Sequence, residues 1–463
     1  MTNMTTACGF ATFTLTNSSL LREFGIVASI NIMMIFLLSL LMIPIIYSYM
    51  TIPNKKHLEH LNRKWMSDFV RWMERMVKHR RVSVYFTSVL ALLLSIMGIY
   101  EIRLSGTIID DMPKKADFYQ DILFFEKHFK GVMPIEILID TKRANGATRL
   151  STLNRMNRLE SDLLEIPELS NPVSAVSIAK YLKQSYYNGN SKYFQLPTAQ
   201  QDNFIRAHAK NLKGEVNFLK SLVDPTGQFA RITVMLQDVS TERMEAIEIE
   251  VKKSIDKHFA ADRFNVSITG KALGYLKGTR FLVRNLVVSL GLAILLIAMF
   301  MAYMFRSFRM ILISLLPNVI PLILTAGMMG FLGIAIKPST ILVFSVAFGI
   351  SVDDTIHFLV KYRQELKATN WNIKKSVYSA LRETGVSMFY TSIVLFFGFS
   401  VFMISSYGGT VALGGLVSAT LLFAMLANLI LLPSLLLSLE KQIANEKTLK
   451  EPKFQILPEK EAE

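Results

Sequence analysis

Cysteine is almost missing from this chain of 463 residues, in which Cys8 stands alone. A single cysteine excludes an intrachain disulfide and a cysteine metal cluster, and because Cys8 lies in an apolar stretch we expect a small buried side chain. No segment has the short apolar core and small-residue cleavage site of a signal peptide. Residues 102–282 contain no Ser/His/Asp set, metal-ligand spacing or Gly-rich phosphate loop, although a triad scattered along the sequence would escape this search. The sequence therefore predicts neither an enzyme nor a protein with a metal or organic cofactor.

Acidic residues are scarce as well. Asp and Glu number 36 against 51 Lys and Arg, which gives a formal net charge of +15. The excess lies in two segments: residues 51–82 have nine basic and three acidic side chains, and residues 361–385 have six and two. Basic loops of membrane proteins gather on the cytoplasmic side, where they also meet anionic lipid, so both segments should be cytoplasmic. No basic motif interleaved with aromatic residues appears, so we expect no nucleic-acid partner.

Apolar residues, in contrast, are abundant: 51% of the chain is hydrophobic and 31 residues are Phe, too much for one soluble core. Runs of about twenty apolar residues predict membrane-crossing helices. Eight candidate spans result: residues 1–17, 24–48, 83–101, 283–304, 309–333, 338–360, 386–405 and 410–438. With the basic segments and the turn Arg306–Arg309 in the cytoplasm, residues 102–282 lie on the outer face and the carboxyl-terminal tail lies inside. The expected fold class is an α-helical integral membrane bundle of about eight transmembrane helices in the plasma membrane, with one extracytoplasmic domain.

One sequence pattern occurs twice in the chain, once near each end. Shifting residues 2–50 by 389 positions lays them without a gap on residues 391–439. The matching pairs include Gly9 and Gly398, Phe10 and Phe399, Gly25 and Gly414, and Pro44 and Pro433. Gly and Pro at fixed spacings rarely coincide by chance, and internal repeats of this kind are typical of transporters built from two related halves.

The first copy of the repeat begins late. The second copy of its opening helix starts near Gly385, which maps about four positions before Met1. We therefore expect the chain to be the C-terminal part of a protein of somewhat under ~800 residues, whose N-terminal half belongs to the same or a separate chain.

Residues 102–282 are long enough to form a core of their own. Their β-like segments are 135–141, 173–178, 229–237 and 264–269, and their helical segments are 150–165 and 241–259. Two βαβ units separated by an insertion predict an α+β domain of the ferredoxin-like type. The insertion at 180–225, which contains Tyr186 and Tyr187, is interpreted as a flap, a partner surface or a purely structural element.

An amphipathic helix is expected within residues 51–82. Its apolar residues recur at spacings of three and four opposite a basic face, and they are Leu58, Leu61, Trp65, Phe69, Trp72 and Met76. Such a helix lies along the inner leaflet, or it packs under the bundle with no lipid role of its own. The expected segments of the chain are thus 1–50 (two spans), 51–82 (linker helix), 83–101 (one span), 102–282 (outer domain), 283–438 (five spans) and 439–463 (tail).

Two adjacent acids, Asp353 and Asp354, interrupt the span at 338–360. They lie about eight residues from Lys361, hence roughly 12 Å deep at 1.5 Å per residue. An ionised carboxyl at that depth costs roughly 3 kcal/mol or more, so it is rarely present without a function. The same cost favours the neutral acid, so that such a group is able to bind and release protons near neutral pH.

Gly349, Asp353 and His357 recur every four residues and share a helix face, whereas Asp354 points about 100° away. One acid is therefore expected to face a proton path and the other a neighbouring helix, with His357 as a third relay group. Two structural alternatives stay open: an Asp that bridges helices without changing protonation, and a His357 that only reaches toward the membrane surface. No comparable acid occurs in the other spans, so a full relay is expected to need the absent half.

Several motifs together resemble the resistance-nodulation-division (RND) superfamily. They are Gly349-Ile-Ser-Val-Asp353-Asp354-Thr-Ile-His357, Leu316-Pro317-Asn318 followed by Pro321, Thr391-Ser392 with Gly398-Phe399, and Gly9-Phe10 with Leu21-Arg22-Glu23-Phe24-Gly25 and Pro44. The branch that the chain resembles is the hydrophobe/amphiphile exporters grouped with the mycobacterial membrane protein large (MMPL) family, cousins of the sterol-sensing-domain proteins. The resemblance covers essentially the whole chain.

This resemblance implies two six-helix halves in the bacterial inner membrane, each with a porter-type outer domain. It implies export driven by the proton gradient, with no cofactor. Asp353 matches the family's intramembrane Asp. Asp354 stands where many relatives have Tyr, so the groups that pass the proton next to Asp353 differ from those of these relatives. Thr391 and Ser392 are candidate neighbours of the relay. Candidate packing or hinge residues are Gly9, Gly25, Pro317, Pro321, Gly349, Gly398 and Gly414.

The expected function is therefore proton-driven export of hydrophobic or lipid-like substrates by one part of a two-half transporter. The expected partners are that substrate, the membrane and the missing half, with a homo-oligomer as a further candidate. A sterol-sensing-like protein that binds lipid without transport is the alternative from another class, and an inactive fragment is the third. Dependence on the proton gradient separates an exporter from a lipid-binding protein.

Overall fold

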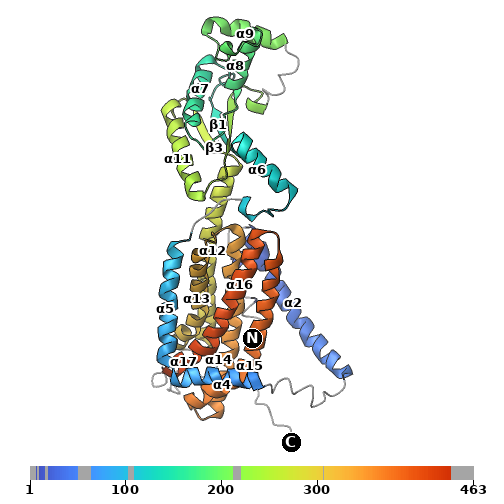
Figure 1. Ribbon diagram of the computed structural model, residues 1–463, viewed down its shortest axis with the longest axis vertical. Helices are drawn as coiled ribbons and strands as arrows, with labels where there is room; N and C mark the ends of the chain where they lie inside the picture. Colours follow the sequence, from blue (N-terminus) through green and yellow to red (C-terminus); the bar gives the residue numbers. More distant parts are fainter. Residues whose placement is uncertain are drawn as a thin grey trace. The chain divides into compact units, whose positions relative to one another are not determined.

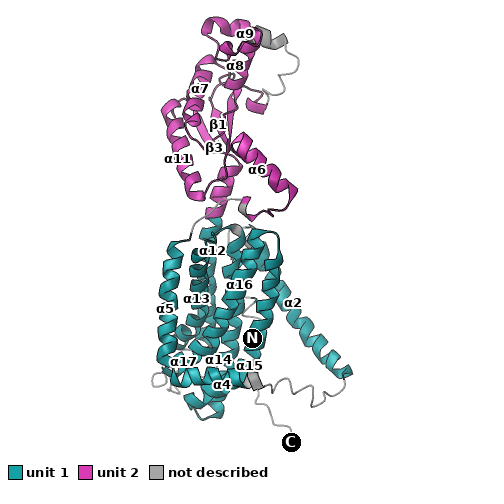
Figure 2. Cartoon of the chain, in the orientation of Figure 1, with its two compact units in different colours: residues 1–103, 281–463 teal, residues 104–280 magenta. Residues whose placement is uncertain are grey.

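The computed structural model of the chain forms two compact units (Figure 2), and each is described by itself. Unit 1 comprises residues 1–103 and 281–463, and unit 2 comprises residues 104–280. The structure describes residues 7, 10–15, 19–50, 64–102, 109–211, 221–305 and 307–438. Cys8, Gly9 and the expected tail at 439–463 lie outside the described residues.

Within the described residues, seven helices are long and apolar enough to cross a membrane (Figure 1). They are α2 (Ser19–Tyr49), α5 (Arg81–Tyr100), α12 (Lys271–Phe305), α13 (Phe308–Phe331), α14 (Pro338–Ala368), α15 (Ile373–Ser400) and α16 (Gly408–Leu426), the last continued by η5 (Ala427–Leu431) and α17 (Leu432–Ser438). The expected spans from residue 24 onward are confirmed as helices, whereas the span at 1–17 lies largely outside the described residues. Both α14 and α15 extend into the basic segment between them, because a helix keeps its backbone hydrogen bonds beyond the apolar stretch.

Helix α14 lies in the interior of the bundle, where it packs against α13, α15 and α16. Its largest buried side chains, Phe348, Phe358 and Tyr362, belong to a core shared with α4, α12 and α13. Lipid is as apolar as these side chains, so close packing and interhelical hydrogen bonds hold such helices together rather than the hydrophobic effect. The position of α14 therefore depends on how well its neighbours fit it.

Small residues bring α5 and α13 into backbone contact. A Cβ placed on Gly330 would lie 1.7 Å from the carbonyl oxygen of Gly98, and one placed on Gly327 would lie 2.4 Å from the Cα of Ser95. Small side chains allow membrane helices to approach this closely. These glycines were not predicted as contact residues, because glycine in an apolar span does not by itself reveal which helix it meets.

The two copies of the internal repeat have the same local structure. Each contains a 3-10 helix, η1 (Thr12–Leu15) in the first copy and η4 (Val401–Ile404) in the second, and the shift of 389 positions lays one on the other. In both copies a long helix follows, α2 after η1 and α16 after η4. The repeat seen in the sequence is thus also a repeat of structure.

A serine forms the same long-range hydrogen bond in both copies. Ser29 of α2 donates to the carbonyl oxygen of Ala7 at 2.9 Å. Its counterpart Ser418 of α16 donates to the carbonyl oxygen of Phe396 at 3.0 Å. The acceptors, like the donors, are related by the shift of 389 positions.

The repeated glycines make equivalent contacts. A Cβ on Gly25 would lie 2.7 Å from the carbonyl oxygen of Phe10, and a Cβ on Gly414 would lie 2.7 Å from that of Phe399. Each glycine therefore lets its helix meet the backbone of the 3-10 segment that precedes it. Gly25 and Gly414 thus lie at close contacts between backbone segments.

Helix α4 (Lys64–His79) packs on the bundle through one face. Val70, Met73 and Val77 are buried there, and the ring of Phe69 contacts that of Phe389 in a tilted arrangement, with 4.5 Å between ring centroids. The described part of the linker thus contacts the bundle through its buried face. Trp65 and the residues before 64 lie outside what the structure describes of side chains, so Leu58 and Leu61 are not placed.

Unit 2 is an α+β domain built on a three-stranded antiparallel sheet in the order β2-β1-β3. Its elements are η2 (Ile109–Asp111), α6 (Asp117–Phe129), β1 (Met133–Asp140), α7 (Leu150–Leu164), α8 (Ala175–Tyr186), η3 (Ser191–Tyr193), α9 (Ala199–Asn211), β2 (Phe229–Leu236), α11 (Thr241–His258) and β3 (Asn265–Thr269). Ile137 at the centre of β1 pairs with Ile232 on β2 and with Ile268 on β3. Apolar residues of β1, β2, α7 and α11 share one core.

The prediction of a strand at 173–178 is wrong. Val173 forms an isolated bridge with Thr233 at the edge of β2, and the chain then enters α8. Ser174 caps this helix, because its hydroxyl oxygen accepts the N–H of Val176. The helix-capping hydrogen bond of Ser174 therefore decided the local structure against the strand preference of the β-branched residues.

The described part of the insertion is mostly helical, and aromatic stacking stabilises it. Tyr187 stacks on Tyr193 of η3 with 4.0 Å between ring centroids and 13° between the planes. Asn188 and Gly189 have positive φ angles of 54° and 79°, which make the tight turn between the two rings. Tyr187 thus has a structural role, one of the three interpretations of this segment.

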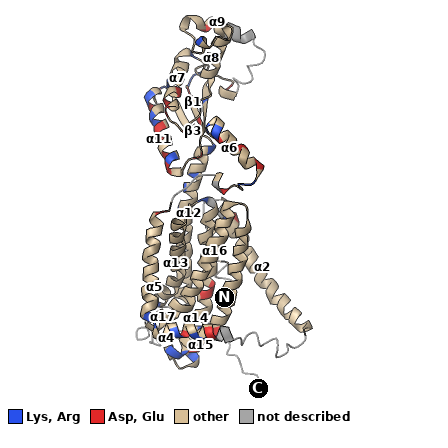
Figure 3. Ribbon diagram, in the orientation of Figure 1, with Lys and Arg blue, Asp and Glu red and all other residues tan. Residues whose placement is uncertain are grey.

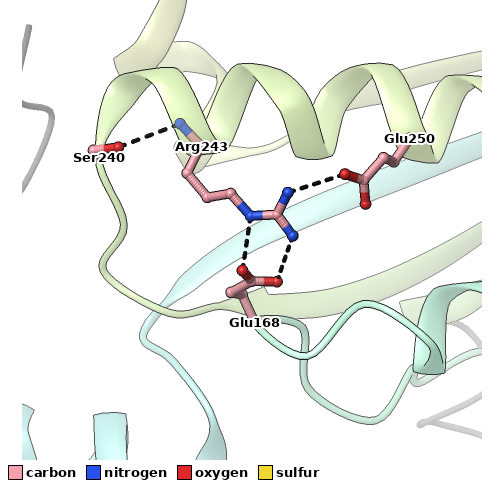
Figure 4. A network of polar contacts seen from close by, with 4 residues as sticks. All are labelled: Glu168, Ser240, Arg243 and Glu250. Atoms are coloured by element: carbon pink, nitrogen blue, oxygen red, sulfur yellow. Dashed lines mark hydrogen bonds and ion pairs between the residues drawn. The ribbon is translucent and has the colours of Figure 1, made fainter.

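An arginine joins the edge of the sheet to α11 (Figure 4). The Nε and Nη2 atoms of Arg243 donate to the two carboxylate oxygens of Glu168 at 2.7 and 2.9 Å, and Nη1 donates to Glu250 at 3.0 Å. These hydrogen bonds lower the pKa of Glu168 against the opposing effect of partial burial. Such two-pronged pairs are among the stronger polar contacts of a protein surface.

Glu160 is a buried acid of unit 2. Its carboxylate accepts a hydrogen bond from the hydroxyl of Ser174, the cap of α8. Burial raises the pKa of Glu160, and the bond from Ser174 and the charge of Lys180 only partly offset this effect. The folded state therefore holds the Glu160 proton to higher pH than the unfolded chain does, so stability falls as pH rises from the ordinary value of 4.5 toward the raised one.

We predict that Glu160→Gln stabilises unit 2 at neutral and alkaline pH, because Gln is neutral there and keeps an oxygen for Ser174. Hydrogen exchange of the sheet amides in the intact protein should be slower in the variant at pH 8 than in the wild type, and equal below about pH 4. Glu165→Gln, at an exposed position of the same segment, is the control and should change neither. Faster exchange in Glu160→Gln at pH 8 would contradict the account.

Candidate functional site

The first acid of α14 is half-buried, and its Oδ1 atom is buried without a hydrogen-bond partner among the described residues. Asp353 has a side chain that is 34% exposed, and its Oδ1 atom lies 3.9 Å from Nε2 of His357, one turn along. Gly349 lies one turn the other way, and a Cβ there would be 3.1 Å from the ring carbons Cε2 and Cζ of Phe10. The structure thus places Gly349, Asp353 and His357 on one face, and it adds the buried Phe10 as a covering side chain.

The second acid faces a neighbouring helix. The Ser392 hydroxyl on α15 lies 3.5 Å from Oδ2 of Asp354, at the limit of a hydrogen bond. Thr391 is not brought to the acids: its side chain is exposed and its hydroxyl donates to the carbonyl oxygen of Ser387 on its own helix. Of the two expected neighbours, Ser392 therefore lies beside the acid pair and Thr391 does not.

A third face of α14 carries a buried group of polar side chains, the α14 polar cluster: Asn318, Ser351, Thr355 and Asn428. The hydroxyl of Ser351 donates to Oδ1 of Asn318 at 2.8 Å. The hydroxyl of Thr355 lies 3.0 Å from Oδ1 of Asn318 and 2.6 Å from Oδ1 of Asn428, so its single proton is donated to one of them at a time. The cluster joins α13, α14 and η5 within one layer of the bundle.

The amide of Asn428 lies where the helix changes its winding. Residues Ala427–Leu431 form a π-helix, η5, between α16 and α17. Single π turns of this kind often occur at functional positions, because the extra residue turns a side chain toward a different neighbour. Here Asn428 reaches α14, where its Nδ2 atom lies 3.4 Å from the carbonyl oxygen of Ser351.

The prolines and the remaining glycine of the sequence analysis have different surroundings. Pro317 and Pro321 are both buried inside α13, on either side of Asn318, and the helix continues across them. The carbonyl oxygen of Pro321 accepts the hydroxyl of Thr325 at 2.8 Å. A Cβ on Gly398 would meet nothing within 4 Å, so the expected packing role of Gly398 finds no contact among the described residues.

Charged side chains tie the basic ends of the helices together. They are sparse along the membrane-length helices and gather around α4 and the adjoining ends of α14 and α15 (Figure 3). Lys361 of α14 pairs with Glu365 and with Glu383 of α15, and Arg382 of α15 donates to both oxygens of Glu74 on α4, at 2.9 and 3.1 Å. These contacts fix one end of α14, about two turns from the acids.

Comparison with known proteins identifies the family. The sequence model of the MMPL family matches residues 145–455, more than half of the chain. The chain belongs to the MMPL family. This confirms the resemblance drawn from the motifs, and together with the seven membrane-length helices it makes the chain a multi-pass membrane protein.

The MMPL chain is similar to two further proteins over part of their length. A protein of Methanocaldococcus jannaschii described as a membrane protein is 30% identical over 139 residues, which are 30% of this chain and 36% of that protein. The crystal structure of SecDF in a super-membrane-facing form covers 95% of this chain and 48% of its own, with a TM-score of 0.43 and 13% identity. The chain thus spans less than half the length of each of these two proteins.

The α14 polar cluster was not predicted from the sequence. Asn318 was noted only as part of a motif, and Ser351, Thr355 and Asn428 were not singled out. The usable signal was a polar amide in an otherwise apolar span, which in a membrane needs a partner. No group of three or more potential metal-ligating residues was found in the part of the chain that the structure describes.

We predict that Thr355→Val destabilises the membrane bundle by about 1–3 kcal/mol, because it leaves the amide oxygens of Asn318 and Asn428 with one donor fewer at nearly unchanged volume. Thr384→Val is the matched control, since the Thr384 hydroxyl donates only to the carbonyl oxygen of Ala380 on its own helix. Thermal unfolding in detergent should show a lower midpoint for Thr355→Val than for the control. Equal midpoints would mean that the cluster does not stabilise the bundle.

Proposed function

We propose that this MMPL chain is part of a proton-driven RND-type exporter of hydrophobic or lipid-like molecules, with Asp353 and Asp354 as its proton-binding groups. The observation that carries the proposal is the position of two adjacent carboxyl groups within a membrane-length helix, on faces that differ from the face holding that helix in place. Family membership and the basic ends of the helices support it. The chain acts with a second half and in the plasma membrane of a bacterium, unit 2 being extracytoplasmic and the carboxyl terminus cytoplasmic.

The chemistry follows from the cost of charge in the membrane. An ionised Asp354 needs a donor nearby, and the hydroxyl of Ser392 is the group within reach on α15. When Asp354 binds a proton, this attraction weakens and α14 is free to move relative to α15. Asp353 and His357, on the partly exposed face of α14, supply the path by which the proton arrives or leaves.

Unit 2 would convert this movement into displacement of the substrate. We infer that it is a ferredoxin-like, porter-type domain whose second strand is reduced to bridges, because Leu169 and Val173 pair with Leu236 and Thr233 at the free edge of β2. This places the shortened strand beside β2 in the strand order of that fold. Such a domain offers a sheet and two helices as a rigid body.

The proposal is tested by energy-dependent efflux of the hydrophobic dye Nile red from the cells that make the protein. We predict that a protonophore stops the efflux, and that Asp353→Asn and Asp354→Asn abolish it, because an amide cannot bind and release a proton. Asp→Asn keeps the shape of the side chain, so the loss would not come from packing.

Lys367→Gln, at the basic end of α14 and beyond the acid pair, is the control and should retain efflux. If both Asp variants kept efflux with the same pH dependence as the wild type, the proposal would be wrong. Dye that binds to the wild-type protein without protonophore-sensitive efflux would support the alternative, a sterol-sensing-like protein that holds lipid without transport.

A further inference from the structure

Helix α2 is poorly covered by the rest of unit 1. No residue in its most apolar window is buried, and Figure 1 shows it running apart from α12, α13, α14 and α16. It contacts the segment that precedes it, through Gly25 against Phe10 and Phe13 and through the hydrogen bond from Ser29 to Ala7. A purely apolar helix would need no other neighbour than lipid.

Two polar side chains make α2 a poor match for lipid alone. Asn31 is exposed and Ser39 is partly exposed, and both lie well inside the span Arg22–Tyr49. Neither side chain forms a hydrogen bond with a residue that the structure describes. An amide without a partner in hydrocarbon is costly, so a polar group at this depth indicates a protein neighbour.

The internal repeat identifies that neighbour. The shift of 389 positions lays Asn31 on Thr420 and Ser39 on Asn428. The Thr420 hydroxyl lies 2.6 Å from the hydroxyl of Thr325 on α13. Asn428 lies 2.6 Å from the Thr355 hydroxyl on α14, so both positions make interhelical hydrogen bonds in the second copy.

Contacts as well as the alignment support the equivalence of α2 and α16. Gly25 and Ser29 already reproduce the contacts of Gly414 and Ser418 with the preceding segment. At the next two positions, the residue type differs between the copies but polarity is kept. The hydrogen bonds that are internal to the repeat are thus formed in both copies, and those that need α13 and α14 are formed only in the second.

We propose that α2 docks between two membrane helices that correspond to α13 and α14, with Asn31 bonded to a hydroxyl or amide on one and Ser39 to a polar group on the other. These helices belong to the second half assigned under the proposed function, on which this inference rests. A second copy of this chain does not fit, because its α13 and α14 already hold α16. The occupant is therefore a different but related bundle.

The test replaces each polar residue by Leu and by the residue of the other copy. If the docking is real, Asn31→Leu and Ser39→Leu should weaken the assembly about fivefold each, the loss of roughly 1 kcal/mol for one hydrogen bond in a membrane. Asn31→Thr and Ser39→Asn should retain it. Assembly is read as the yield of a photocross-link from p-benzoylphenylalanine in place of Met34, an exposed neighbour of Asn31 on α2, in the membranes of the cells that make the protein.

The position of the cross-link decides the identity of the occupant. A cross-linked peptide from a membrane helix outside residues 1–463, lost in the Leu variants and kept in the exchange variants, supports the proposal. A cross-link to lipid, or to this chain or another copy of it, overturns it, as does unchanged yield in Asn31→Leu. Ser48→Leu is the control, because the Ser48 hydroxyl donates to Ile45 of its own helix. The readout is assembly rather than efflux, so its failure is separate from failure of the proton-driven mechanism.

Discussion

The hydrogen bonds around Thr355 are the constraint on which the membrane bundle depends. Hydrocarbon offers no water to a polar side chain, so each of the four members of the α14 polar cluster needs the others. Their bonds fix the height and rotation of α14 against α13 and η5. With that face fixed, the positions of Asp353 and Asp354 on the other faces are fixed too, because they lie on the same turn of helix.

Each face of helix α14 thus has a different role. The face of Ser351 and Thr355 holds the helix in the bundle, and the face of Asp354 meets α15. The face of Asp353 and His357 is partly exposed. The ion pairs of Lys361 hold its basic end. A change in the charge of Asp354 therefore changes its attraction to α15. The α14 polar cluster meanwhile keeps the position of α14 relative to α13 and η5. This arrangement is suited to coupling proton binding to movement of one helix pair.

The sequence was sufficient to predict the features that depend on periodicity. Apolar runs located the helices, the four-residue spacing grouped Gly349, Asp353 and His357, and fixed spacings of Gly and Pro revealed the repeat. Features that depend on contact between distant segments were not predictable: the approach of Gly330 to Gly98, the ring of Phe10 against Gly349, and the partners of Asn428. The wrong strand at 173–178 has a local cause, since the capping bond of Ser174 started a helix where the apolar residues suggested β structure.

The central claim is that the acids of α14 change their protonation within the physiological range, and carbodiimide labelling tests it most directly. Dicyclohexylcarbodiimide modifies protonated carboxyl groups in apolar surroundings, and the modified residue is located by mass spectrometry. The account predicts an adduct on Asp353 or Asp354 whose yield falls as the pH is raised between about 5 and 9. No adduct on either residue, or a yield that does not change over this range, would contradict it and leave the acids as structural groups.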